Sequence, residues 1–275
     1  MKNRKILRMI RMALLFVIFL CLILIVRECC LSVNHRIQQK KLEERLQAEG
    51  NGEGEGQKYP EIESVSGQKI EDMKQELKME KEPVILDKYA GLYEENSDLA
   101  GWLSIEGMKI NYPVMQCGDD EYYLHHDFYG NEDKYGCLYV RETADVNTPG
   151  TNFVIYGHNM RDGSMFGDLD LYKDEDFFKE HSLISFDTLY EERTYEIVAV
   201  FLSRVYREDE EVFKYYDFYE ADTQEEFQDF YENIKSMSLY DTGVTAEYGD
   251  TFITLSTCAY HVEDGRLVVV AKRVE

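Results

Sequence analysis

The chain has 275 residues, and 54 aspartates and glutamates against 30 lysines and arginines give it a formal net charge of −24 at pH 7. Proteins recognise nucleic-acid phosphates with basic surfaces, so this charge argues against nucleic acid as a partner. The 21 tyrosines and only 4 prolines favour an ordered, β-rich domain over a disordered chain.

The N-terminus has the pattern of a membrane anchor. Residues 1–11 contain five lysines or arginines and no acid, and residues 12–26 are fifteen apolar residues without a charge. With its flanks, this stretch approaches the roughly 20 residues that span a bilayer. The flank RECCLSVNHR lacks the small residues of a signal-peptide cleavage site, which favours an uncleaved anchor. We expect a cytoplasmic tail at 1–11, a single transmembrane anchor at 12–28 and an extracellular remainder.

A tether is expected to follow the anchor. Residues 34–49 are strong helix formers with interspersed charges, and residues 50–57 are a flexible run of glycine and acid. A second charged helical stretch is expected at 66–81. We assign residues 29–82 to an extracellular helical and flexible stalk, and residues 83–275 to a globular domain.

The globular domain is predicted to be mainly β. A helical spacing of apolar residues occurs at 86–93, and Trp102 and Leu103 mark the entry to a strand. Short alternating runs follow, namely MKINYPVMQ, GCLYVRE, TNFVIYGH, SLISFDTL, TYEIVAVFLSRVYR, TFITLSTC and GRLVVVAKRV. Seven or eight strands predict a closed or nearly closed barrel. One helix is expected among them, because Thr223 and Glu226 form a capping-box pattern ahead of the apolar face of Phe227, Phe230, Tyr231 and Ile234.

Cys258 ends the hydroxyl-rich strand TFITLSTC. A thiol at a strand end is either one more small buried residue or a nucleophile, and cysteine is the most nucleophilic of the common side chains. The globular region has two further cysteines, Cys117 and Cys137, so at most one disulfide forms there and one thiol stays free. Cys21, Cys29 and Cys30 lie in the membrane segment or at its outer edge.

His158 is the best candidate for a base among six histidines. It follows an apolar strand and a glycine in NFVIYGHNM, and strand ends are where barrels present reactive groups. A purely structural role stays open at this point. His125 and His126 lie in a turn-like aromatic stretch, and His181 is expected to open a strand.

Arg266 returns in a predicted hairpin eight residues after Cys258. Its guanidinium can donate two hydrogen bonds to a developing oxyanion. The alternative is a solvated arginine paired with Glu263 or Asp264, while Arg273 is carried away along the strand. The sequence has no HExxH, CxxC, EF-hand or phosphate-loop pattern, so we expect neither a metal nor a cofactor.

These motifs together resemble the sortase family, and within it class B. TLSTC followed by GRLVVVAKR is similar to the family's cysteine and arginine strands, and FVIYGHNMRDGSMFGDLDLY is similar to the class B histidine region. The segment YYLHHDFYGNEDKYGCLYV and the late helix also resemble the family, over roughly residues 83–275. The resemblance implies a closed eight-stranded sortase barrel with N-terminal helices and one additional helix late in the barrel.

The resemblance also implies a cysteine transpeptidase of secreted surface proteins. Cys258 would attack the threonine carbonyl of a sorting signal, His158 would protonate the leaving amine, and Arg266 would hold the oxyanion. An amine of the cell-wall precursor or of a pilin would then resolve the thioacyl enzyme. Ser256, Thr257 and Asn159 are the expected substrate-binding residues, and the loop at 206–217 is expected to help select the motif.

Two alternatives remain at this point. A cysteine peptidase would use the same Cys258 and His158 but resolve the acyl enzyme with water. A non-catalytic, membrane-tethered surface protein would merely bury Cys258. The sequence also departs from the family at Cys137, where serine or another small residue is more usual, and this makes a Cys117–Cys137 bridge conceivable.

Overall fold

The computed structural model describes residues 2–50 and 83–274. The flexible run predicted beyond Gly50 and the helix predicted at 66–81 lie outside these residues. The chain divides into two compact units, Met1–Arg45 and Leu46–Glu275. Each unit is described by itself.

Helix α1 runs from Lys2 to Gly50, and its residues up to Arg45 form the first unit. The apolar side chains from Leu14 to Val26 are exposed along this helix. Within the described residues, α1 is the one helix that is long and apolar enough to cross a membrane. A membrane anchor and a signal segment both have this character, and the helical form predicted for residues 34–49 is confirmed.

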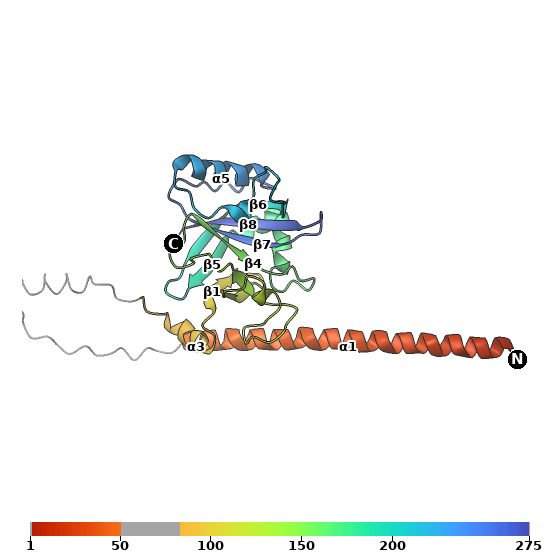
Figure 1. The fold of residues 1–275 in the computed structure, drawn as a ribbon. Helices are drawn as coiled ribbons and strands as arrows, with labels where there is room; N and C mark the ends of the chain where they lie inside the picture. The colour runs from red at the N-terminus through yellow and green to blue at the C-terminus, as the bar shows by residue number, and fades with distance from the viewer. Residues whose placement is uncertain (1, 51–82, 275) are drawn as a thin grey trace, which may run out of the picture. The chain divides into compact units, whose positions relative to one another are not determined.

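The second unit is built on a closed barrel of eight strands (Figure 1). The strands are β1 (Leu99–Ser104), β2 (Asn111–Met115), β3 (Leu138–Val140), β4 (Asn152–Tyr156), β5 (Leu183–Thr188), β6 (Thr194–Arg204), β7 (Phe252–Cys258) and β8 (Gly265–Arg273). Their order around the barrel is β1-β2-β3-β4-β7-β8-β6-β5. The predicted closed, eight-stranded barrel is confirmed, with its first strand starting three residues before Trp102.

Two of the strand pairs are parallel, and one of them determines where the site forms. Strand β4 pairs in parallel with β7, and Tyr156 lies opposite Ser256. Strand β7 pairs on its other side with β8 in antiparallel fashion, and Cys258 lies opposite Arg266. The ends of β4 and β7 and the start of β8 therefore meet at one rim of the barrel.

Side chains alternate between the barrel interior and its outer surface along these strands, as the pleat requires. In β7, Ile253 and Leu255 belong to the interior core, whereas Phe252 packs in a second cluster outside the barrel. In β8, Leu267 and Val269 point inward in the same way. Residues two apart share a face, so Cys258 continues the outward row that starts at Phe252.

Helices pack around the barrel. They are α3 (Asp87–Glu95), α4 (Glu175–Glu180), α5 (Gln224–Met237) and the short 3₁₀ segments η1 (Tyr122–Leu124), η2 (Gly167–Lys173) and η3 (Tyr215–Asp217). The sequence did not indicate α4, and the expectation that His181 opens a strand is wrong. His181 instead caps the C-terminus of α4, stacked on Phe177 with the ring centroids 4.1 Å apart, and β5 starts two residues later.

Helix α5 is the predicted late helix, and it covers the outer side of the barrel beside β6 (Figure 1). Thr223 and Glu226 form the predicted capping box, each side chain accepting a hydrogen bond from the other residue's backbone N–H. Phe227, Phe230 and Ile234 are buried against the barrel in a cluster that includes Phe252 of β7. The helix thus buttresses the strand that ends in Cys258.

Replacing Phe230 with alanine tests this buttress. Phe230 stacks on Phe218 with the ring centroids 4.0 Å apart and lies 5.5 Å from the Phe252 ring. Its loss leaves a cavity, and we expect the free energy of unfolding of the Leu46–Glu275 unit to fall by about 3–5 kcal/mol in denaturant titration. Gln228→Ala, on the exposed face of the same helix, should change it by less than about 0.5 kcal/mol. Equal effects of the two substitutions would contradict the packing described.

Candidate active site

Cys258 is the last residue of β7 and is partly exposed to solvent. Every other residue of this strand is buried, because the strand runs between β4 and β8 in the middle of the sheet. The thiol is therefore carried to the surface at the barrel rim by a rigid element. A sulfur atom in this position can attack a bound carbonyl group, whereas a cysteine inside a core cannot reach one.

Arg266 is the cross-strand partner of Cys258 in the β7–β8 hairpin. The backbone N–H of Ala259 donates to the Gly265 carbonyl at 2.9 Å and closes the hairpin beside the thiol. The Arg266 guanidinium donates to the Asp264 and Gly265 carbonyls at 3.2 and 3.0 Å. Arg266 thus bonds to backbone carbonyls of the turn and not to the Glu263 or Asp264 carboxylate, which was the alternative considered. The other nitrogens of the guanidinium stay available as donors.

His158 lies two residues beyond the end of β4, which is hydrogen bonded to β7. Continuing the register from Tyr156 and Ser256 brings His158 level with Cys258. The backbone N–H of Gly157 donates to the Ser256 carbonyl at 3.3 Å, so the pairing extends past the end of the strand. The three candidate residues therefore come together at one rim, on three neighbouring strands.

A backbone carbonyl holds the His158 ring. Nε2 of His158 lies 2.8 Å from the carbonyl oxygen of Leu124, at the end of η1. A carbonyl oxygen only accepts hydrogen bonds, so Nε2 must carry a hydrogen in both the neutral and the protonated ring. Nδ1 is consequently the nitrogen that gains and loses a proton.

The three predicted substrate-binding residues have defined hydrogen bonds. Ser256 is buried, and its hydroxyl lies 2.8 Å from the hydroxyl of Tyr215 in η3. Thr257 is buried as well and donates to the Gly157 carbonyl at 2.8 Å. Asn159 donates from Nδ2 to the Cys258 carbonyl at 2.8 Å. The bonds of Thr257 and Asn159 tie the ends of β4 and β7 together, and the bond of Ser256 ties β7 to η3. Contact with substrate stays a prediction for all three residues.

Tyrosines lie on the outer face near the end of β7. Tyr139 of β3 stacks on Tyr156 of β4 with the ring centroids 5.4 Å apart. Burial raises the pKa of both Tyr139 and Tyr215 to about 12, so both phenols are neutral at physiological pH. The positive charge of Arg266 offsets part of this rise in the pKa of each phenol. The site thus has an aromatic, hydrogen-bonding wall beside its nucleophile.

Sequence reasoning missed two contributors, the Leu124 carbonyl and Tyr215. A main-chain carbonyl carries no residue-type signal, and Tyr215 is one of 21 tyrosines. The only available hint for Tyr215 was its position inside the loop at 206–217, which was expected to border the substrate. Arg273, the less favoured arginine, lies at the other end of β8 and pairs with Glu191 at 3.2 Å.

The remaining cysteines take no part in this site. Cys117 and Cys137 are both free thiols, so the conceivable bridge between them is absent. Cys137 is buried, and burial raises the pKa of its thiol far above the ordinary range. No group of three or more histidine, cysteine or acidic side chains suited to a metal occurs within residues 2–50 and 83–274.

Comparison with known proteins identifies the family. The sortase domain model matches residues 103–274, which is more than half of the chain. The chain therefore belongs to the sortase family and is a cysteine transpeptidase of that family. The matched region contains the ends of β4 and β7 and the start of β8, where the candidate site forms.

Its relatives are sortases of class B. Sortase B of Listeria monocytogenes is 34% identical over 201 residues, which are 69% of this chain and 75% of the relative. The structure of sortase B from Bacillus anthracis in complex with AAEK2 is 28% identical, with a TM-score of 0.68 over 88% of this chain and 97% of that one. The Staphylococcus aureus sortase B–substrate complex has a TM-score of 0.68 at 23% identity, over 89% and 98% of the chains, and supports the fold.

The Leu124 carbonyl predicts the tautomer of His158. In ¹⁵N-histidine-labelled protein, neutral His158 should give the chemical shifts of an imidazole protonated at Nε2. His126 is an internal control, because its Nδ1 lies 2.7 Å from the Tyr122 carbonyl and should give the opposite tautomer in the same spectrum. A His158→Gln variant assigns the signals. A neutral His158 protonated at Nδ1 would contradict this geometry.

Proposed function

We propose that this sortase cleaves a threonine-containing sorting signal of secreted proteins and transfers the threonine carbonyl to an amine. The observation that carries the proposal is the position of Cys258, His158 and Arg266 at the ends of three neighbouring strands, on one rim of the barrel. A nucleophile, a proton carrier and a guanidinium in one place are what acyl transfer through a thioester requires.

Cys258 acts as the nucleophile in the first half of the reaction. Its thiol passes its proton to Nδ1 of His158, the sulfur attacks the threonine carbonyl, the C–S bond forms, and the peptide bond after threonine breaks. The departing amine needs a proton, and Nδ1 of His158 supplies it because Nε2 is held by the Leu124 carbonyl. The product is a thioacyl enzyme and a free C-terminal fragment.

Arg266 stabilises the charge that develops on the carbonyl oxygen. Two of its guanidinium bonds go to the turn at Asp264 and Gly265, which fixes the side chain before substrate arrives. A donor that is already oriented does not have to be reorganised during the reaction, and such a donor contributes roughly 3–4 kcal/mol to lowering the barrier.

The donor peptide contacts the outer face of β7 beside the thiol. Ser256 shares this face with Cys258, and its bond to Tyr215 couples it to the loop at 206–217. We assign selection of the sorting motif to this loop. Asn159 and Thr257 act next to the peptide. They hold the enzyme's own backbone at Cys258 and Gly157, beside the scissile carbonyl of the substrate. The Staphylococcus aureus relative has been solved as a substrate complex, which supports a peptide partner.

An amine resolves the thioacyl enzyme in the second half of the reaction. It belongs to the cell-wall precursor or to a pilin, and no cofactor is needed, because the thioester keeps the energy of the cleaved peptide bond. The apolar segment of α1 anchors the enzyme in the cell membrane, with the basic N-terminus in the cytoplasm and the catalytic domain outside. This places the site where secreted proteins and wall precursors meet.

Transfer to an added amine tests the proposed function. The full chain in detergent is mixed with a panel of threonine-containing sorting peptides and triglycine, and mass spectrometry follows the products. We expect a peptide–triglycine product with the wild type and none with Cys258→Ala, because no thioester forms without the sulfur. Release of a product ending in threonine carboxylate, with no transfer, would favour the cysteine peptidase. No product of either kind would contradict the proposal.

The choice between the two arginines of β8 gives a second prediction. Arg266→Ala should lower kcat/KM for the donor peptide roughly 100- to 1,000-fold, because the oriented oxyanion donor is lost. Arg273→Ala, at the far end of the same strand, should stay within about threefold of the wild type once folded protein is matched by circular dichroism. A larger loss with Arg273→Ala than with Arg266→Ala would contradict the assignment.

A further inference from the structure

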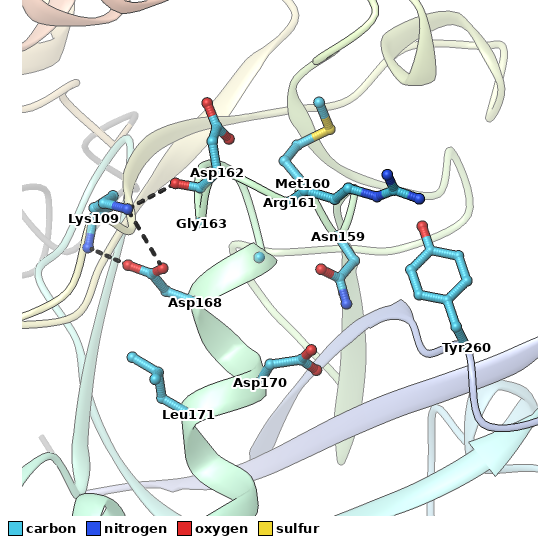
Figure 2. A pocket seen from close by; sticks show the side chains of 11 residues that line it. Lys109, Asn159, Met160, Arg161, Asp162, Gly163, Asp168, Asp170, Leu171 and Tyr260 are labelled. Atoms are coloured by element: carbon cyan, nitrogen blue, oxygen red, sulfur yellow. Dashed lines mark hydrogen bonds and ion pairs between the residues drawn. The ribbon is translucent and has the colours of Figure 1, made fainter.

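A second pocket flanks the reaction centre (Figure 2). It has a volume of about 670 Å³ and lies between the loop that follows His158, the start of η2 and the turn that follows Cys258. The side chains that line it and enter the argument are Lys109, Asn159, Arg161, Asp168, Asp170 and Tyr260. Neither the outer-face tyrosines nor Ser256 belong to its walls. Apart from Asn159, it is therefore separate from the surface proposed for the donor peptide.

The pocket is connected to the main chain of the nucleophile. Asn159 lines it and donates from its side-chain amide to the Cys258 carbonyl at 2.8 Å. Tyr260 lines the other wall two residues beyond Cys258 and is 82% exposed. A molecule in this pocket therefore lies against the segments that flank Cys258 and His158 and does not compete with the acyl chain for the outer face of β7.

The charges in the pocket leave one cation uncommitted. Lys109 donates from Nζ to the Asp162 carbonyl at 2.7 Å and pairs with Asp168 at 3.8 Å. Asp170 pairs with Lys173 at 2.8 Å. Arg161 is exposed and has no hydrogen bond or ion pair with any residue in the described part of the chain. In Figure 2 its side chain extends over the pocket above Asn159, on the side of Tyr260.

We infer that this pocket binds the acceptor, and that the acceptor is an amine that also carries a carboxylate. The inference rests on the proposed function, because it concerns the second half of that reaction. Arg161 binds the carboxylate, since a guanidinium fork matches it with two parallel hydrogen bonds. The amine end points toward Cys258 past Asn159, and Asp170 favours its approach as an ammonium ion.

The chemical step is balanced within this arrangement. The ammonium ion first gives one proton to solvent. The amine nitrogen then attacks the thioacyl carbonyl, and the C–N bond forms as the C–S bond breaks. The second proton passes to Nδ1 of His158, and Cys258 is released as the thiolate. The donor chain leaves attached to the acceptor through an amide bond, with no oxidant, metal or further reactant.

Two acceptors that differ only in charge test the inference. Triglycine carries a carboxylate, and triglycinamide does not. With the full chain in detergent and the best donor peptide, Arg161→Ala should raise KM for triglycine about tenfold and change KM for triglycinamide less than twofold. Arg161→Lys should recover part of the loss, because it keeps the charge without the fork. Equal effects on the two acceptors, or no effect on either, would overturn the inference.

A matched pair of carboxylates gives the control. Asp170 and Asp176 both form i,i+3 pairs with lysines on exposed turns, Asp170 with Lys173 and Asp176 with Lys179, but only Asp170 lines the pocket. Asp170→Asn should raise KM for triglycinamide about threefold, and Asp176→Asn should leave it unchanged. If the two substitutions raise KM for triglycinamide equally, the effect comes from the overall charge of the protein, and the inference fails.

The two proposals fail in different ways. Formation of the thioacyl enzyme is followed by mass spectrometry before any acceptor is added. If no thioacyl enzyme forms with the wild type, the proposed function itself fails. If it forms and Arg161→Ala still transfers to triglycine with the KM of the wild type, the proposed function stands and the acceptor pocket is refuted.

Discussion

The hydrogen-bond register of β7 with its two neighbours is the constraint on which the site depends. The parallel pairing with β4 brings His158 level with Cys258, and the antiparallel pairing with β8 puts Arg266 opposite the same residue. A slip of one residue in either pair would turn a member of the set to the opposite face of the sheet. The long β6–β8 pairing and barrel closure make such a slip costly, because every inward side chain would lose its core position.

The alternation of inward and outward side chains along β7 divides the surroundings of the thiol into two parts. The outer face of β7 runs from Phe252, which α5 covers, through Ser256, which Tyr215 covers, to the partly exposed Cys258. Beyond the strand end, the loop after His158 and the turn after Cys258 enclose the charged pocket with Arg161 at its edge. A transpeptidase must hold two substrates around one sulfur atom, and this rim offers each a separate approach.

The sequence predicted the elements that local patterns encode. Alternating runs indicated the strands, the Thr223–Glu226 pattern indicated α5, and residue chemistry at strand ends pointed to His158 and Cys258. The resemblance to sortases then decided between a buried thiol and a nucleophile. What failed depends on packing and on backbone contacts. His181 packs on nearby Phe177 of an unexpected helix, and the Leu124 carbonyl reaches His158 across 34 residues. Neither contact leaves a periodic or compositional trace.

The central claim is that Cys258 is the atom that receives the acyl group, and mapping the trapped intermediate tests it most directly. The full chain is incubated with the donor peptide alone, quenched in acid and digested for tandem mass spectrometry. The account predicts a hydroxylamine-labile acyl group on the fragment that contains Cys258, and unmodified Cys117 and Cys137. An acyl group on another cysteine would contradict it. So would the absence of any adduct in folded protein whose Cys258 also resists alkylation.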